Sequence, residues 1–248
     1  MIICENPKHS LKLLNKLGIK KKLIPLHDYN ENSIIQKLSK EFAKKKIVLI
    51  SDAGSPLISD PGFKLISHCI KKNFKITTVP GPNSIIPALQ LSGIPINEFH
   101  FAGFFPKAKV AMSVFLEEIK DSDKTSVFFV SNHKIDSCLN LIQEKIGTRL
   151  VSISKELTKV NEKVFRGLGH QLKDVILSSK ENMKGEFVFV VEGKPLKQKG
   201  DFAIRMHDKE IRKMLLKFSL TDVVEIVHKL TGINKNKVYK CLLDIKNS

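Results

Sequence analysis

Residues 47 to 62 read I-V-L-I-S-D-A-G-S-P-L-I-S-D-P-G, and this stretch decides the fold class. Four apolar residues without alternation predict a strand that is covered on both faces, as in a parallel sheet. The loop that follows is rich in aspartate, proline and glycine, and open α/β sheets bind ligands beyond the carboxyl ends of their strands. Turns and a helix cap would explain each aspartate alone, but the whole loop, 51–62, favours a binding site.

Strands and helices alternate through the first part of the chain, which predicts a mainly parallel α/β sheet there, and a second α/β pattern follows. In the first part we expect helices at 8–17, 31–45, 63–71 and 84–92, with strands at 22–27, 47–50, 75–79 and 99–104. In the second part we expect strands at 125–130, 149–154, 163–166 and 186–192, with helices at 135–146 and 171–178.

These patterns divide the chain into two α/β domains and a tail. The predicted boundaries are 1–104 for the first domain, 113–193 for the second and 201–248 for a basic helical tail. Residues 105–112 would link the α/β domains, and K-P-L-K-Q-K-G after Gly193 would be a flexible basic linker. The tail carries an apolar stripe at helical spacing, so a helical pair that packs a dimer is the alternative to a role in contacting nucleic acid.

The chain of 248 residues carries 42 Lys+Arg against 25 Asp+Glu, a formal net charge of +17. This surplus favours a polyanionic partner, most often nucleic acid, although a lysine-rich proteome would produce the same bias. The four cysteines lie far apart, which predicts free thiols and neither disulfides nor a metal site. No apolar run is long enough to span a membrane and no signal peptide is evident, so we expect a cytoplasmic protein without a membrane partner.

Two further polar segments follow predicted strands. P-G-P-N-S at 80–84 precedes a predicted helix. The side chain of Asn83 or Ser84 would cap the first amides of that helix, and a simple turn is the alternative. K-E-L-T-K at 155–159 would point two cations and a carboxylate into a cleft, although a solvated charge run is the more common explanation.

Six segments together resemble one known family in order and spacing. They are S-D-A-G-S-P-L-I-S-D-P-G, V-P-G-P-N-S, L-S-G-I-P, F-A-G-F-F-P, K-E-L-T-K and G-E-F-V-F-V-V-E-G. The chain closely resembles the ribosomal RNA small subunit methyltransferase I family, which belongs to the tetrapyrrole-methylase-like group. The resemblance runs from residue 2 to the C-terminus, where T-G-I-N-K-N-K-V-Y is similar to the family's turn between two helices.

The resemblance implies two α/β domains with S-adenosylmethionine in the cleft between them, a small C-terminal helical segment, and usually a homodimer. It implies 2′-O-methylation of a cytidine ribose in the 16S rRNA of the small (30S) ribosomal subunit. Catalysis in such a site is mostly positioning, because the sulfonium is already reactive and the 2′-oxygen must be held in line with its methyl group.

The resemblance also implies which residues form the site. Loop 51–62 and segment 80–84 would form walls of the cofactor cleft, and a base would remove the hydroxyl proton. The candidate bases are Asp52, Glu5 and Lys155, among which the sequence does not choose. The candidate cofactor-binding residues are Ser51, Asp52, Ala53, Gly54, Pro56, Pro80, Gly81, Pro82 and Ser84.

The sequence departs from the family's pattern in two places. The family begins with a strand and a loop of the form A-T-P-I-G-N-L-x-D about thirty residues ahead of this Met1, so we expect an N-terminally truncated chain with unpaired sheet edges. The family's A-E-D-T-R is C-E-N-P-K at 4–8, and lysine cannot make the bidentate contact of arginine. The role of this motif therefore transfers to Glu5 and only weakly to Lys8.

Two other functions are compatible with these segments. A tetrapyrrole (small-molecule) methylase would share the loop, but it has no need of a basic helical extension. A non-catalytic RNA-binding remnant would follow from the missing first strand. Salt-sensitive RNA affinity distinguishes the rRNA enzyme from the first alternative, and binding of S-adenosylmethionine distinguishes it from the second.

Overall fold

The computed structural model describes residues 1–179, 181–195 and 207–247. The chain forms two compact units: Met1–Lys120 with Lys124–Glu192, and Asp121–Asp123 with Gly193–Ser248. The division into three domains stays a prediction, and the linker expected at 194–200 lies mostly outside the described residues. Within the described part of the chain, no helix is long and apolar enough to cross a membrane.

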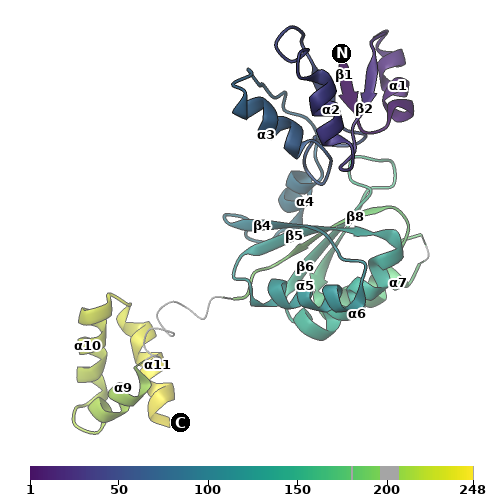
Figure 1. Cartoon of the computed structure of the whole chain (residues 1–248). Coiled ribbons are helices and arrows are strands. Elements are labelled where there is room, and N and C mark those ends of the chain that lie inside the picture. The colour runs from purple at the N-terminus through teal and green to yellow at the C-terminus, as the bar shows by residue number, and fades with distance from the viewer. Residues whose placement is uncertain (180, 196–206, 248) are drawn as a thin grey trace. The chain divides into compact units, whose positions relative to one another are not determined.

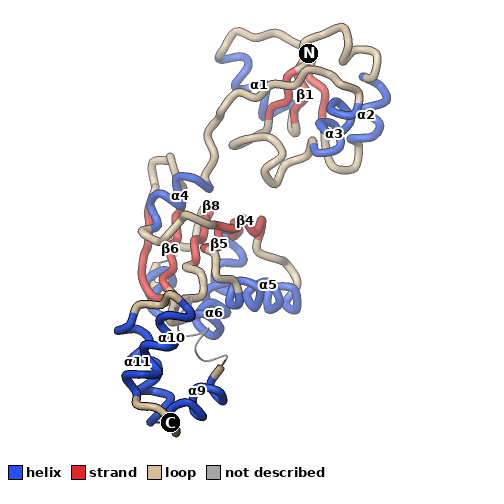
Figure 2. The backbone as a smooth tube through the Cα atoms, turned by 90° about the vertical axis from the view of Figure 1, so that its left-hand side faces the viewer, coloured by secondary structure: helices blue, strands red, loops and turns tan. Residues whose placement is uncertain are grey.

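The first unit opens with a three-stranded parallel sheet in the order β2-β1-β3. Its strands are β1 (Ile2–Cys4), β2 (Leu23–Pro25) and β3 (Val48–Ile50), and its helices are α1 (Pro7–Lys16), α2 (Glu31–Leu38) and α3 (Phe63–Lys71). Figure 2 shows the three strands side by side with α2 and α3 next to them. Central β1 is wholly buried, whereas Val48 on edge strand β3 is 51% exposed, so the prediction that this strand is covered on both faces is wrong there.

Two predicted elements of this part differ in the structure. The helix expected at 31–45 ends at Leu38 and continues as turns. The strand expected at 75–79 is absent: these residues are exposed and pair with no described strand. An apolar, β-branched run forms a strand only where a neighbouring strand pairs with its N–H and C=O groups.

The second sheet of the first unit has five strands in the order β4-β5-β8-β6-β7. They are β4 (Phe99–Phe104), β5 (Thr125–Ser131), β6 (Leu150–Lys155), β7 (Lys163–Leu168) and β8 (Glu186–Val191). Only β4 and β5 pair in parallel; the β5–β8, β8–β6 and β6–β7 pairs are antiparallel. The prediction of a mainly parallel sheet, made from the first part of the chain, is therefore correct for the first sheet, and the second sheet is mainly antiparallel.

The strands of this sheet alternate between two apolar cores. Phe128, Phe189 and Ile153 are in register on one face, which α5 (Lys109–Asp121), α6 (Ile135–Ile146) and α7 (Gly169–Leu177) cover. Val127 and Val190 point to the other face, where α4 (Ile85–Ser92) packs. Figure 1 shows α4 on one side of the sheet and α5 and α6 on the other. A short 3-10 turn, η1 (Asn132–Lys134), joins β5 to α6.

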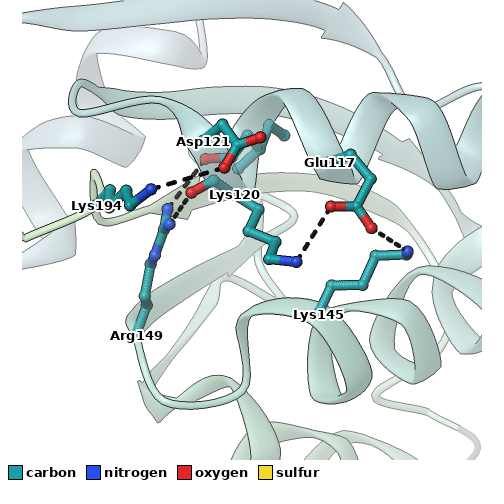
Figure 3. Close-up of polar contacts among 7 residues, drawn as sticks. Glu117, Lys120, Asp121, Lys145, Arg149 and Lys194 are labelled. Atoms are coloured by element: carbon teal, nitrogen blue, oxygen red, sulfur yellow. Dashed lines mark hydrogen bonds and ion pairs between the residues drawn. The ribbon is translucent and has the colours of Figure 1, made fainter.

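Helix α5 begins at Lys109, so the linker predicted at 105–112 is wrong for its last four residues. Its buried residues Met112, Leu116 and Ile119 follow helical spacing. Arg149 closes the other end of this helix. Its guanidinium is buried and donates to the main-chain carbonyls of Ile119, at 3.0 Å, and Lys120. Figure 3 shows Arg149 reaching this helix end, while Lys194 pairs with Asp121 at the surface.

The second unit is helical, as predicted for the tail. It contains α9 (Asp208–Leu215), α10 (Leu220–Thr231) and α11 (Lys235–Asn247). Ser219 caps α10 by accepting from the Asp222 amide at 3.2 Å, and Gly232 ends the helix with φ +69°. The unit has its own core, centred on Val223, Val238 and Leu242.

Replacing Arg149 with methionine is expected to lower the unfolding free energy by about 2–4 kcal/mol, because buried carbonyls lose their charged donor. Urea unfolding followed by circular dichroism measures the change. Lys194→Met is the matched control: its ion pair with Asp121 is exposed and spans 3.7 Å, so it is expected to cost less than about 1 kcal/mol. Equal effects of the two substitutions would contradict the capping role of Arg149.

Candidate functional site

The carboxyl ends of all three strands meet at one edge of the first sheet. Cys4 is in register with Pro25 on one side and with Ile50 on the other. The residues that follow these strands therefore leave the sheet next to one another, which is where parallel sheets bind ligands. A hollow of about 560 Å³ lies there, lined by Glu5, Asn6, Pro7, Lys8, Pro25, His27 and Asp52.

Helix α1 begins in this hollow. The Asn6 side chain accepts from the amides of Lys8, at 3.1 Å, and His9, at 3.4 Å, and Pro7 occupies the first turn, where a missing N–H costs nothing. The Asn6 amide in turn donates to Asp52 Oδ1 at 3.2 Å. This hydrogen bond ties loop 51–62 to the segment after β1 and brings Asp52 and Glu5 into the same hollow.

Loop 51–62 follows a strained path. Gly54 and Gly62 have φ values of +73° and +131°, which glycine adopts freely, but Leu57 at +69° and Ser59 at +63° pay a steric cost. The Ser51 hydroxyl stabilises the first turn by donating to the Gly54 carbonyl at 2.9 Å. Backbone strain of this kind persists where the surroundings hold it, as is common at binding sites.

Asp60 does not cap the helix after the loop, although one reading of the sequence allowed it. The N-cap of α3 is Gly62, and the amide of Leu65 in its first turn donates instead to Glu31 Oε2, at 3.1 Å. Asp60 Oδ2 is buried without a hydrogen-bond partner. Burial raises the pKa of the Asp60 carboxyl, and the Glu5 and Asp52 carboxylates raise it further.

The second predicted wall, 80–84, contacts the loop directly. The Ser55 hydroxyl donates to the Pro82 carbonyl at 3.3 Å, and a methyl group added to Gly54 would lie 3.7 Å from the same oxygen. Asn83 Oδ1 accepts from the Ile86 amide at 3.0 Å, so Asn83, and not Ser84, caps α4 with its side chain. The structure thus brings the two groups of candidate cofactor-binding residues together.

The structure does not bring Lys155 to this hollow. Lys155 lies on β6, is only 5% exposed, and its Nζ donates to the Glu181 carbonyl. Its neighbour Glu156 accepts from the Glu186 amide at 2.8 Å, and this bond, together with Lys159, lowers the pKa of the Glu156 carboxyl. The K-E-L-T-K segment therefore ties β6 to β8, which neither reading of the sequence anticipated.

The sequence reasoning missed two polar residues that line the hollow, His27 and Asn6. His27 lines the hollow because it follows β2, and the rule that sites form at the carboxyl ends of parallel strands would have found it. Asn6 stood in a quoted motif but was not assigned, because its role depends on a tertiary contact. Asp60 was offered as an acceptor or a helix cap, and its burial depends on tertiary contacts as well. Among the described residues, no group of three or more His, Cys, Asp or Glu is arranged to hold a metal ion.

Comparisons with known proteins agree with this fold. Residues 2–173 match the family model of the Tetrapyrrole (Corrin/Porphyrin) Methylases. The ribosomal RNA small subunit methyltransferase I of Haemophilus influenzae is 35% identical over 245 residues, which cover 97% of this chain and 86% of that protein. The protein of the same name from Vibrio cholerae is 36% identical over 245 residues, covering 97% and 84%.

Among solved structures, a crystal structure of diphthine synthase aligns with a TM-score of 0.55 and 12% identity over 77% of this chain and 78% of that one, which shows the fold alone. Fold and family model together define a methyltransferase of the tetrapyrrole methylase class. Within that class, the chain belongs to the ribosomal RNA small subunit methyltransferase I family. The family resemblance and the fold class predicted from the sequence are thereby confirmed.

Because the pKa of Asp60 is raised, its contribution to the free energy of unfolding depends on pH. Because the folded state holds the Asp60 proton more tightly than the unfolded chain does, the contribution of Asp60 to stability is greatest at low pH and falls as pH rises from about 4 through the folded-state pKa. We expect Asp60→Asn to stabilise the fold at neutral pH and to reduce this fall, as measured by urea unfolding across pH. Unfolding profiles parallel to those of the wild type would contradict the assignment.

Proposed function

We propose that this chain transfers the methyl group of S-adenosylmethionine to the 2′-oxygen of a cytidine ribose in 16S rRNA of the small ribosomal subunit. Family membership supports the reaction class and the rRNA substrate, since the relatives carry the name of that activity. The observation that carries the proposal in the structure is the placement of Glu5 and Asp52 in one hollow at the carboxyl edge of the first sheet.

The residues around the hollow fit the cofactor by their chemistry. S-adenosylmethionine, when bound, supplies an activated methyl group on a positively charged sulfur. Asp52 and Glu5 bring two carboxylates to the hollow against one lysine, Lys8, and they can accept hydrogen bonds from ribose hydroxyls or an amine. Asp60, with its unpartnered buried Oδ2, adds a third acceptor, and Gly54 leaves the backbone accessible next to Pro82.

The proposed chemistry asks little of the protein beyond positioning. The walls at 51–56 and 80–84, joined by the Ser55–Pro82 hydrogen bond, hold the reactants in line, and this orientation supplies most of the rate. Asp52 and Glu5 are the proposed bases for the 2′-hydroxyl proton, because Lys155 is held on the Glu181 carbonyl. Asn6 occupies Asp52 Oδ1 and so leaves Oδ2 for that proton.

The charge of the chain supports an RNA substrate. The surplus of +17 is continued in the second unit, where Lys235, Lys237 and Lys240 are all exposed on α11. Basic side chains at a helix surface bind phosphates through counterion release.

We further propose that the enzyme is cytoplasmic, where it meets the 30S subunit, and that it acts as a homodimer, as the resemblance implies.

Replacing Asp52 with alanine is expected to lower methyl transfer at least about tenfold, because the loop loses its tie to Asn6 and the site loses a carboxylate. The assay follows label from S-adenosylmethionine into small subunits that lack the modification, and nuclease digestion then locates the label. The wild type is expected to place it on a cytidine 2′-oxygen.

Two variants sharpen this assay. Asp52→Asn keeps an oxygen for the Asn6 amide, so it separates loss of charge from loss of the tie. Asp136→Ala removes an exposed aspartate from the first turn of α6 and should leave transfer unchanged. Full activity of Asp52→Ala would refute the role of the loop, and label on a base or a small tetrapyrrole would refute the proposed substrate.

Deleting residues 196–248 is expected to raise KM for the small subunit and to leave S-adenosylmethionine affinity unchanged. The reason is that the second unit has its own core and carries basic side chains but none of the residues that line the hollow. Steady-state kinetics and calorimetry measure the two quantities. Equal RNA affinity with and without these residues would contradict the prediction and show that they serve in packing alone.

A further inference from the structure

A second groove lies between α2 and α3, next in the chain to the site loop. The two helices pack through Ile34 and Leu38 on α2 and Leu65 and Cys69 on α3, all of which are buried. Next to these buried residues, side chains three and four positions apart on both helices border a groove of about 560 Å³. It is lined by Asn32, Ile35, Gln36, Phe63, Lys64, Ser67, His68 and Lys71.

Phe63 stands at the start of this groove with 73% of its surface exposed. It is the first residue of α3 and follows Gly62, the last residue of the site loop. A single exposed apolar side chain is ordinary, but an aromatic ring beside exposed cations is the combination that binds single-stranded nucleic acid. The position of Phe63 therefore connects the groove to the candidate site along the chain.

The charge of the groove is positive. Lys64 and Lys71 are exposed, His68 is half-buried, and none of the lining residues is acidic. Glu31, the acidic residue in the first turn of α2, is only 3% exposed and accepts from the Leu65 amide at 3.1 Å. Its carboxylate thus holds α2 and α3 together from the buried side, and the groove is formed before any ligand binds.

We propose that this groove binds single-stranded RNA flanking the methylated nucleotide, with a base stacked on Phe63 and phosphates beside Lys64 and Lys71. The inference rests on the proposed rRNA substrate and adds where that substrate is held. Stacking on an aromatic ring tolerates any base, and phosphate contacts carry most of the affinity. Asn32 and Gln36 offer amide groups to the base edges.

The test compares full-length variants for affinity to unmodified small subunits at several salt concentrations. Lys64→Glu with Lys71→Glu is expected to weaken binding at least tenfold and to reduce the salt dependence. Phe63→Ala is expected to weaken it about 5- to 100-fold with the salt dependence unchanged. Lys12→Glu with Lys37→Glu makes the same charge change at exposed positions of α1 and α2 outside the groove, and a much smaller loss is expected.

S-adenosylmethionine affinity is expected to be the same in all these variants, which shows that the fold and the hollow are intact. Groove variants that bind like the Lys12/Lys37 control would overturn the inference while leaving the proposed function standing. A fall in mass from dimer to monomer on light scattering, in the groove variants alone, would also overturn it by making the groove a contact between copies. A wild type that neither binds nor methylates small subunits would defeat the proposed function, and this inference with it.

Discussion

The parallel pairing of β1 with both β2 and β3 is the constraint on which the site depends. Because Cys4 is in register with Pro25 and Ile50, the chain leaves the sheet three times at one edge. Glu5, His27 and Asp52 meet there although they are far apart in sequence. The 3.2 Å hydrogen bond from the Asn6 amide to Asp52 then fixes the loop against the start of α1.

Within this strongly basic protein, carboxylates gather at the hollow and cations gather at the α2–α3 groove. The hollow gathers the carboxylates of Glu5 and Asp52 against one lysine, Lys8, and Asp60 lies close enough for the two carboxylates to raise its pKa. The α2–α3 groove carries cations and no carboxylate. In the proposed reaction the methyl donor is a cation and the acceptor is a polyanion, so each region complements one reactant. The cost is strain and charge repulsion in loop 51–62, as is common where sites are built for binding.

Local pattern predicted much of this fold. The helices at 63–71 and 135–146 and the strand at 99–104 have the predicted bounds, because apolar spacing and flanking glycines are local signals. The strand at 75–79 and the burial of Val48 were predicted wrongly, and the antiparallel pairs of the second sheet were not predicted. Each depends on which strand lies alongside, and a local pattern does not carry that information.

The same division holds for the site. The motif around Asp52 marked the loop, and Asn83 was correctly offered as a cap, since both signals are local. The tie from Asn6, the burial of Asp60 and the diversion of Lys155 to the Glu181 carbonyl are contacts between distant segments. The role of Glu31 at the start of α3 belongs to the same class, because its partner lies 34 residues away.

Hydrogen–deuterium exchange with and without S-adenosylmethionine tests the central claim most directly. If the cofactor binds at the carboxyl edge of the first sheet, its addition should slow exchange in peptides covering 5–8, 51–56 and 81–84 and leave α10 and α11 unchanged. Protection confined to other segments, or none at saturating cofactor, would contradict the placement of the site.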